Sequence, residues 1–168
     1  MNLKRVFTAA AMSAMLFLPG NAAWPDEKAT ADPTDVLAKQ WIAGWNSRNT
    51  DQLLQLFTSD VFYEDVAFGE ANHGSAELRK YAADYFEAVP DLELKLLRAS
   101  IHNGHGNIEW ILSGTDKGMF KTGKKFSVRG VSVIDVRDGK IFRNLDFYDA
   151  ATIMRQVGLL PAPGTDAK

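Results

Sequence analysis

The stretch GKIFRNLDFYD, residues 139–149, indicates the fold most clearly. It runs from a turn glycine into a strand that carries carboxylates. Its side chains alternate with the period of two that is typical of a β-strand. On that period Asp146 shares a face with Phe142, Asn144 and Tyr148. A carboxylate costs free energy to bury on such a face, so Asp146 is a candidate for acid–base chemistry. The alternative is an ion pair with Arg143 or Arg129, or a contact with a helix end.

Three further strands are expected upstream of this stretch. The same alternation predicts them at residues 92–101, 107–114 and 124–136. The connections between consecutive strands carry the turns HNGHG, KTGK and RDGK, each of which contains glycine and is of hairpin type. Four strands joined in this way predict an antiparallel meander.

The first half of the domain is expected to be mainly helical. The spacing of apolar residues predicts a helix over 75–89 that Pro90 ends, and another from Pro33 through Trp45 with Asp32 as its N-cap. A short helix is expected at 50–57 and a strand at 61–68, and a last short helix follows Asp149. Helices first and strands last predict an α+β fold, a curved antiparallel sheet packed on the N-terminal helices and enclosing a pocket.

The two ends of the chain are expected to lie outside this domain. Residues 1–22 combine a basic start, a short apolar run and small residues near a cleavage point, which is typical of a signal peptide. We therefore expect a periplasmic or secreted protein. Residues 23–32 are predicted to be a flexible linker, 33–161 the single domain and 162–168 a flexible tail.

Composition narrows the functional classes. The formal net charge of −2 gives no electrostatic footprint for nucleic acid or for an anionic membrane. The chain has no cysteine, and its histidines lack ligand partners at metal-binding spacing, so we expect no metal. Phosphate loops and dinucleotide fingerprints are also missing, and we therefore predict no cofactor.

A second carboxylate, Asp65, alternates with Val61 and Tyr63 on the strand predicted at 61–68. If Asp65 and Asp146 both face the cavity, desolvation raises the pKa of at least one of them toward the range of a working acid or base. The alternative hypothesis for Asp65 is structural: it closes the strand by accepting hydrogen bonds from backbone amides.

The remaining candidates would contact substrate. They are Tyr63, Trp41, His73, Trp110, Asn144 and Tyr148, whose alternative roles are packing for the tryptophans and surface exposure for His73. Asp149 is interpreted as structural, an N-cap for the last helix, with catalysis as its second interpretation.

Four stretches carry a resemblance to a known family. They are WNSRNTDQLLQLFTSDVFYEDVAF, HGSAELRKYAADYFEAVPDLEL, SGTDKGMFKTGKKFSVRGVSVIDVRDGKI and DFYDAATIMRQVGLLP. Together they resemble the nuclear-transport-factor-two-like superfamily, and most of all its branch of SnoaL-like polyketide cyclases and ester cyclases. The resemblance implies a cone-shaped sheet around a pocket.

Individual residues match different branches of that superfamily. In the cyclases an aspartate on the last strand serves as acid and base, which implies that role for Asp146. Ketosteroid isomerases resemble the stretch around Asp65, which implies proton shuttling there, but their two oxyanion donors fall at Trp41 and near Ser132. Limonene-epoxide hydrolases would place the water-activating aspartate at Asp149, while their arginine and aspartate partners fall at about Ser113 and Thr115.

These observations lead to three functional hypotheses. The first is a cofactor-independent isomerase, dehydratase or cyclase that acts on a small apolar carbonyl compound and uses Asp65 and Asp146 as acid and base. The second is a non-catalytic module that binds a small apolar ligand in the same cavity. The third is an interaction domain, since Val128, Val131 and Val133 supply apolar area, and we expect a homodimer.

Overall fold

The structure, a computed structural model, describes residues 35–161 and residue 164. The predicted signal peptide, linker and most of the tail lie outside these residues. Within the described range no helix is long and apolar enough to span a membrane. The elements in chain order are α1 (Asp35–Asn46), α2 (Thr50–Leu54), β1 (Phe57–Asp65), β2 (Glu70–His73), α3 (Gly74–Ala88), β3 (Glu93–His102), β4 (His105–Thr115), β5 (Lys125–Arg137), β6 (Lys140–Tyr148) and α4 (Ala150–Gln156).

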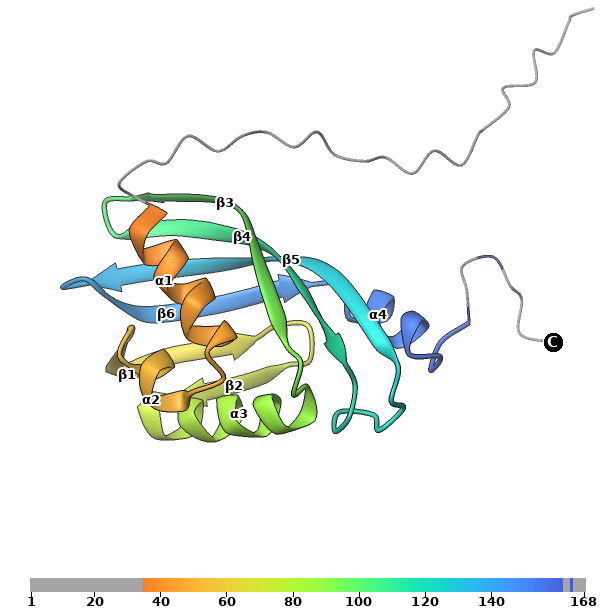
Figure 1. The fold of residues 1–168 in the computed structure, drawn as a ribbon. Coiled ribbons are helices and arrows are strands. Elements are labelled where there is room, and N and C mark those ends of the chain that lie inside the picture. Colours follow the sequence, from red (N-terminus) through yellow and green to blue (C-terminus); the bar gives the residue numbers. More distant parts are fainter. Residues whose placement is uncertain (1–34, 162–163, 165–168) are drawn as a thin grey trace, which may run out of the picture.

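The six strands form one curved, unclosed sheet with the order β2-β1-β6-β5-β4-β3 (Figure 1). The predicted meander is confirmed, because β3, β4, β5 and β6 pair consecutively and antiparallel. One strand pair departs from the antiparallel pattern, since β1 runs parallel to β6. The α+β class and the helix-backed, cone-like curvature are as expected.

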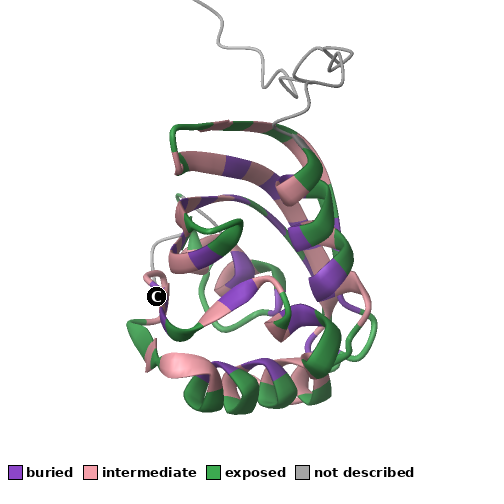
Figure 2. Cartoon of the chain, turned by 90° about the vertical axis from the view of Figure 1, so that its left-hand side faces the viewer, coloured by how far each residue is buried: buried purple, intermediate pink, exposed green. Residues whose placement is uncertain are grey.

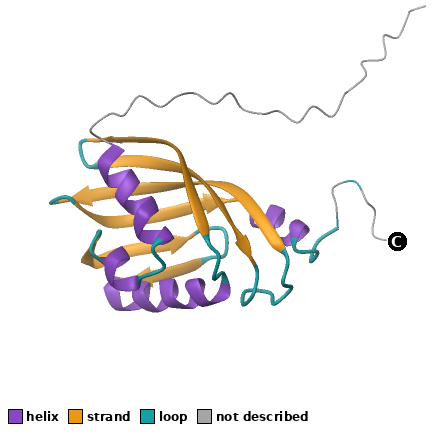
Figure 3. Ribbon diagram, in the orientation of Figure 1, coloured by secondary structure: helices purple, strands orange, loops and turns teal. Residues whose placement is uncertain are grey.

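Helices α1 and α3 supply most of the helical packing (Figure 3), with α1 against β3 and α3 against β1. Trp41 and Trp45 lie one turn apart on α1, and both are buried. Leu78 and Ala82 likewise lie one turn apart on α3, and both are buried. The i, i+4 spacing puts each pair on one face of its helix, so both helices bury an apolar stripe against the sheet. Figure 2 shows buried and partly exposed residues alternating along the strands.

Two boundaries in the first half differ from the prediction. Helix α2 ends at Leu54, and the chain enters β1 at Phe57, whereas the sequence pattern favoured a helix to Phe57 and a strand from Val61. Strand β1 ends at Asp65, so residues 66–69 form a turn rather than the end of the strand. Strand β2 was not predicted; its four residues are too few to show a period.

The register of β6 changes near its start. Asp135 pairs with Arg143, but Val136 pairs with Ile141, so Phe142 is an extra residue on β6. Ile141 is buried, whereas Phe142 is half-buried and lies under the guanidinium of Arg137 at 5.1 Å. The bulge therefore removes Phe142 from the face that carries Asn144 and Asp146.

The connection between β4 and β5 is a nine-residue loop, residues 116–124, rather than the expected tight hairpin at KTGK. Asp116 organises it. Its buried carboxylate accepts from the backbone amides of Phe120 at 2.9 Å and Thr122 at 2.8 Å, and from the Thr122 hydroxyl at 2.7 Å. Burial alone would raise the pKa of Asp116, but these hydrogen bonds outweigh it and hold the pKa below its usual value.

The loop is also attached to the end of α3. The amides of Lys117 and Gly118 both donate to the carbonyl of Ala88, at 2.8 and 3.0 Å. A side chain at position 118 would not fit, because a Cβ there would lie 2.6 Å from the Ala88 Cα. Glycine therefore allows the loop to lie against α3 and hold Met119 and Phe120 in place.

We predict that Asp116→Ala lowers the free energy of unfolding by about 3 kcal/mol, because it leaves several loop donors without their charged acceptor. Chemical denaturation measures the change, and hydrogen exchange should become faster in residues 117–124. The control is Asp84→Ala, which removes an exposed ion pair with Lys80 and should cost under about 0.5 kcal/mol. Equal effects of the two substitutions would contradict the assigned role of Asp116.

Candidate active site

Two carboxylates meet at the junction of β1 and β6. Asp65 and Asp146 are register partners in the parallel pair, and only 3% and 6% of their surfaces are exposed. Val61 and Tyr63 precede Asp65 on the same face of β1 and are also buried, as the strand period predicts. Since side chains alternate between the two faces of a strand, Asp65 shares the buried, concave face with Val61 and Tyr63. Its register partner Asp146 lies on the same side of the sheet.

Asp146 accepts three side-chain hydrogen bonds. The Ser132 hydroxyl and the Asn144 amide nitrogen both donate to Oδ1 at 2.6 Å, and the Tyr63 hydroxyl donates to Oδ2. Ser132 is the register partner of Asp146 on β5, so the antiparallel pairing of β5 with β6 positions this donor. The carboxylate is therefore held in one orientation by groups from three strands.

A second layer of hydrogen bonds comes from two tryptophans. Trp41 donates from Nε1 to Oδ1 of Asn144 at 3.0 Å, and Trp110 donates from Nε1 to the Ser132 hydroxyl at 2.8 Å. The two indoles stack, with ring centroids 6.4 Å apart. Each of them holds one of the groups that in turn hold Asp146.

Trp110 reaches Ser132 because position 130 has no side chain. A Cβ at Gly130 would lie 2.2 Å from the Trp110 ring. The glycine therefore gives the indole room to cross β5, and its role is steric rather than a matter of backbone conformation.

The environment of Asp146 favours a retained proton. Burial raises the pKa of Asp146 to about 6, and the negative charge of Asp65 acts in the same direction. The hydrogen bonds from Ser132, Tyr63 and Asn144 oppose the rise. The carboxyl thus changes its protonation state close to neutral pH, where an acid or base works best.

Asp65 has different donors. The hydroxyls of Tyr81 and Tyr148 donate to Oδ2 at 3.0 and 2.6 Å, and the Phe68 amide donates to Oδ1 at 3.2 Å. Burial, together with the charge of Asp65, raises the pKa of Tyr81 and of Tyr148 well above the usual value. Both tyrosines therefore remain protonated and act as donors.

Two adjoining cavities meet at Asp65. The inner chamber has a volume of about 30 Å³, and the outer cavity one of about 700 Å³. Asp65, Tyr81 and Tyr85 line both cavities, whereas Asp146 lines the inner chamber alone.

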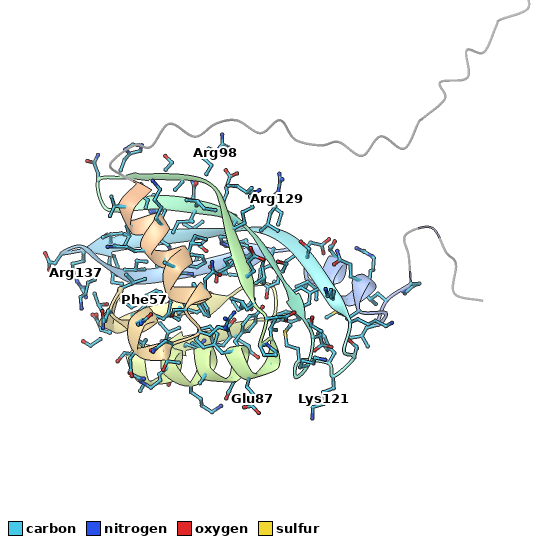
Figure 4. The ribbon with its side chains drawn as sticks, in the orientation of Figure 1. Phe57, Glu87, Arg98, Lys121, Arg129 and Arg137 are labelled. Carbon is cyan, nitrogen blue, oxygen red and sulfur yellow. The ribbon has the colours of Figure 1, made fainter. Side chains whose placement is uncertain are left out.

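The two linings differ in character. Besides the two carboxylates, the inner chamber is lined by Trp41, Trp45, Tyr63, Tyr81, Tyr85, Leu92, Leu94, Trp110, Leu112 and Tyr148. The outer cavity combines Phe68, Met119 and Phe120 with charged groups such as Glu87 and Lys121, which Figure 4 labels on α3 and on the loop. Aromatic and aliphatic side chains thus surround the inner chamber, while the larger cavity has a mixed lining.

Most of the candidate residues gather around the inner chamber. Trp41, Tyr63, Trp110 and Tyr148 line it with the two carboxylates, and Asn144 is fully buried behind Asp146. Sequence reasoning did not name Ser132, Tyr81 or Tyr85 as site residues, and it interpreted Trp45 as core or pocket wall. On helices the aromatic residues look like part of the packing stripe, and no local signal distinguishes a serine that binds a carboxylate.

His73 is not brought to this group. It is exposed at the end of β2, and its ring lies against Phe62 with centroids 5.1 Å apart. Its backbone amide donates to the Glu77 carboxylate at 2.7 Å. The structure thus places His73 at the start of α3 and outside both cavities.

Asp149 also lies away from the cavities. It occupies the N-cap position of α4, and its carboxylate accepts from the Thr152 hydroxyl at 2.6 Å rather than from a helix amide. This hydrogen bond holds the pKa of Asp149 below its usual value, and Arg155 lies 3.7 Å away. Asp149 thus contacts Thr152 and Arg155 of α4 and lines neither cavity.

The described residues contain no cluster of three histidine, aspartate or glutamate side chains that could hold a metal ion. What the site offers is a pair of buried carboxylates surrounded by hydroxyl donors and aromatic rings. Such a pair can take a proton from a bound molecule and return one.

The fold and this site define a class of small α+β proteins in which a curved sheet and its helices surround buried acid–base groups. A family model for the SnoaL-like polyketide cyclases matches residues 35–157, and the chain belongs to this family. The expected branch is thereby confirmed.

Individual relatives agree with this assignment. The cyclase aurE of Calcarisporium arbuscula is 31% identical over 104 residues, which are 61% of this chain and 76% of that protein. A hypothetical protein from Catenulispora acidiphila with a ketosteroid isomerase-like fold, solved with trimethylamine, superposes with a TM-score of 0.69 at 24% identity over 74% of this chain and 94% of its own. TsrD from Streptomyces laurentii gives 0.67 at 21% identity over 78% and 100%. The two solved structures support the fold alone.

We predict that Asp146→Asn becomes more stable relative to the wild type as the pH rises. The unfolded chain releases this proton near 3.8, while the folded chain keeps it to about 6. The wild type therefore loses stability between these values, by about 3 kcal/mol in total, and the asparagine variant does not. Denaturation of both proteins at several pH values measures the difference.

Asp60→Asn serves as a control of opposite sign. Asp60 is an exposed residue of β1 whose pKa is lowered by its hydrogen bond with Arg137 at 2.7 Å. Its contribution is present above the unfolded pKa and is lost as the pH falls through the folded value. A difference for Asp146→Asn that stays constant with pH would contradict the environment assigned to Asp146.

Proposed function

We propose that this protein is a cofactor-free acid–base enzyme that moves a proton on a small carbonyl compound. Isomerisation, dehydration and intramolecular ring closure all require a proton to leave one atom and return to another. Membership of the SnoaL-like family supports a cyclase or an isomerase. The substrate would enter the outer cavity and meet Asp65, whose carboxylate accepts from the Tyr148 hydroxyl.

The observation that carries this proposal is the pairing of two carboxylates in unlike surroundings. Asp146 is enclosed by the inner chamber, and burial keeps its pKa near 6. Asp65 lines the outer cavity as well and accepts from two tyrosine hydroxyls. Neighbouring acids in different environments can hold different protonation states at one pH, which is what separate acid and base roles need.

A binding role for the same cavity is the second candidate. It is favoured by the hydrogen bonding of Asp146, since three donors from the protein itself already engage this carboxylate. A carboxylate held in this way can orient a ligand without taking its proton. Enzyme and binding module differ in whether a carbon-bound proton of the ligand exchanges with solvent.

The test follows that exchange directly. The wild type is incubated in D₂O with simple ketones such as cyclohexenone and indanone, and deuterium gain at carbon is followed by mass spectrometry. Asp65→Asn and Asp146→Asn should each slow exchange by about 10²- to 10⁴-fold, the usual contribution of a general acid or base. Asp60→Asn, on the same strand as Asp65 but exposed, should exchange like the wild type.

Binding of a ketone without exchange, detected by ligand-observed NMR, would replace the enzyme hypothesis with the binding module. Exchange that persists in both aspartate variants would assign the proton transfer to other groups. Either outcome contradicts the proposed roles of Asp65 and Asp146.

The proposal also includes export and self-association. The signal-like sequence of residues 1–22 supports export. On the outer face of the sheet Val131 lies opposite Phe147 and Val133 opposite Leu145, and Phe147 is 40% exposed. An apolar strip of this kind suits the sheet of a second copy.

Native mass spectrometry of protein purified from the periplasm examines these expectations together. The expected species is a dimer of chains cut near Ala22 that retains a small neutral molecule in part of the population. Phe147→Glu should give monomers, because the charge would be buried in the apolar interface. An uncut chain would exclude export, and a wild-type monomer would exclude the dimer.

A further inference from the structure

One buried donor in the site lacks a protein partner. Trp41 and Trp110 each give their indole N–H to a side chain, whereas Nε1 of Trp45 has no hydrogen-bond partner among the described residues. Trp45 is only 4% exposed and lines the inner chamber. A buried donor left unpaired costs about 1–3 kcal/mol, so such groups in folded proteins are nearly always satisfied.

The size of the inner chamber points to the partner. Its volume of about 30 Å³ is the space open to the centres of water-sized spheres. One water occupies about 10–15 Å³ and needs between two and four polar partners. The chamber therefore has room for a water, and the far larger outer cavity is the place for a ketone.

The two carboxylates have free acceptor positions for the hydrogens of a water in the chamber. An ionised carboxylate has about four acceptor positions. Asp146 uses two on Oδ1 and one on Oδ2, and Asp65 uses one on Oδ1 and two on Oδ2. Each carboxylate thus has one position left. A water has two hydrogens to donate to these positions and a lone pair to accept from Trp45.

We infer that the inner chamber is a binding site for one ordered water that accepts from Trp45 Nε1 and donates to both Asp65 and Asp146. This water gives the unpaired indole a partner and fills the remaining acceptor position of each carboxylate. It also joins two groups that no hydrogen bond links directly in the structure.

The water gives the two aspartates different roles in proton transfer, and this assignment of roles rests on the proposed function. Asp65 lines the outer cavity and is the group that meets the substrate, while Asp146 reaches only the chamber. When Asp146 takes up a proton, it donates to the water instead of accepting from it, and a proton can pass from Asp146 to the water while the water passes one of its own to the Asp65 carboxylate. One proton moves, the water is restored, and Asp146 acts as a positioning residue behind Asp65.

The first test is made on the unmodified protein with ¹⁵N-labelled tryptophan. Cross-relaxation between each indole N–H and water is measured by NMR. The Trp45 N–H should show a direct contact with a long-lived water, and that of Trp41, which donates to Asn144 Oδ1, should not. Trp110 is not used as a negative control, because its acceptor is the Ser132 hydroxyl, whose exchange with solvent would mimic a bound water.

Two variants test whether the Trp45 signal comes from a water inside the chamber. Leu112→Phe places a larger ring in the chamber wall and should abolish the Trp45–water contact, while the indole N–H resonances of Trp41 and Trp110 remain at their wild-type positions. Trp45→Phe removes the donor and keeps an aromatic ring, and a crystal structure should show the water absent or displaced. Absence of the Trp45–water contact in the wild type would overturn the inference.

The outcomes are distinguishable from those of the proposed function, because the NMR signal requires no substrate. A bound water in a protein that catalyses no exchange would leave the water site standing and refute the enzyme. Ketone exchange in a protein without the Trp45–water contact would support the enzyme and refute the water site. If both hold, Trp45→Phe should slow ketone exchange in D₂O by about tenfold or more, as the loss of an acid–base relay predicts.

Discussion

The arrangement of this protein depends on keeping the Asp146 carboxylate inside an aromatic interior. A buried carboxylate without hydrogen bonds would be far too costly, and three donors make its burial tolerable. Ser132 and Asn144 reach it only if β5 and β6 keep their register, since a slip by one residue would turn each side chain to the opposite face. The strand pairing and the hydrogen-bond network therefore stabilise one another.

The parallel pairing of β1 with β6 brings the second carboxylate to the first. Between these two strands the chain forms β2, α3 and the β3–β5 part of the meander, so the pairing closes a long loop. Helix α1 then supplies Trp41 and Trp45, while α3 supplies Tyr81 and Tyr85, so the aromatic lining comes from elements that pack on the concave side. The site thus forms only when helices and sheet are assembled together, as expected for a single cooperative domain.

How far the sequence predicts this structure depends on whether a feature is local. The strands from Glu93 to Tyr148 and the helix over α3 were predictable because their periods persist over nine or more residues. Strand β2 and the parallel pairing were not, because one is too short to show a period and the other is a long-range choice. Asp65 and Asp146 stood out as carboxylates on apolar strands, whereas Tyr81 and Trp45 have the same pattern as ordinary packing residues. Asp116 escaped notice because its partners are mainly backbone amides of the loop.

The resemblance to the isomerases takes on a different meaning once the contacts are known. The two positions that correspond to the isomerases' oxyanion donors are Trp41 and the neighbourhood of Ser132, and here both donate within the protein. Ser132 binds Asp146 directly, and Trp41 binds it through Asn144. Donors that would face a developing enolate instead hold a carboxylate, so negative charge on a substrate would have to be met by tyrosine hydroxyls or by a proton from an acid. For the proposed reaction, that requirement gives the raised pKa of Asp146 a purpose, because a carboxyl with a pKa of about 6 can still supply a proton close to neutral pH.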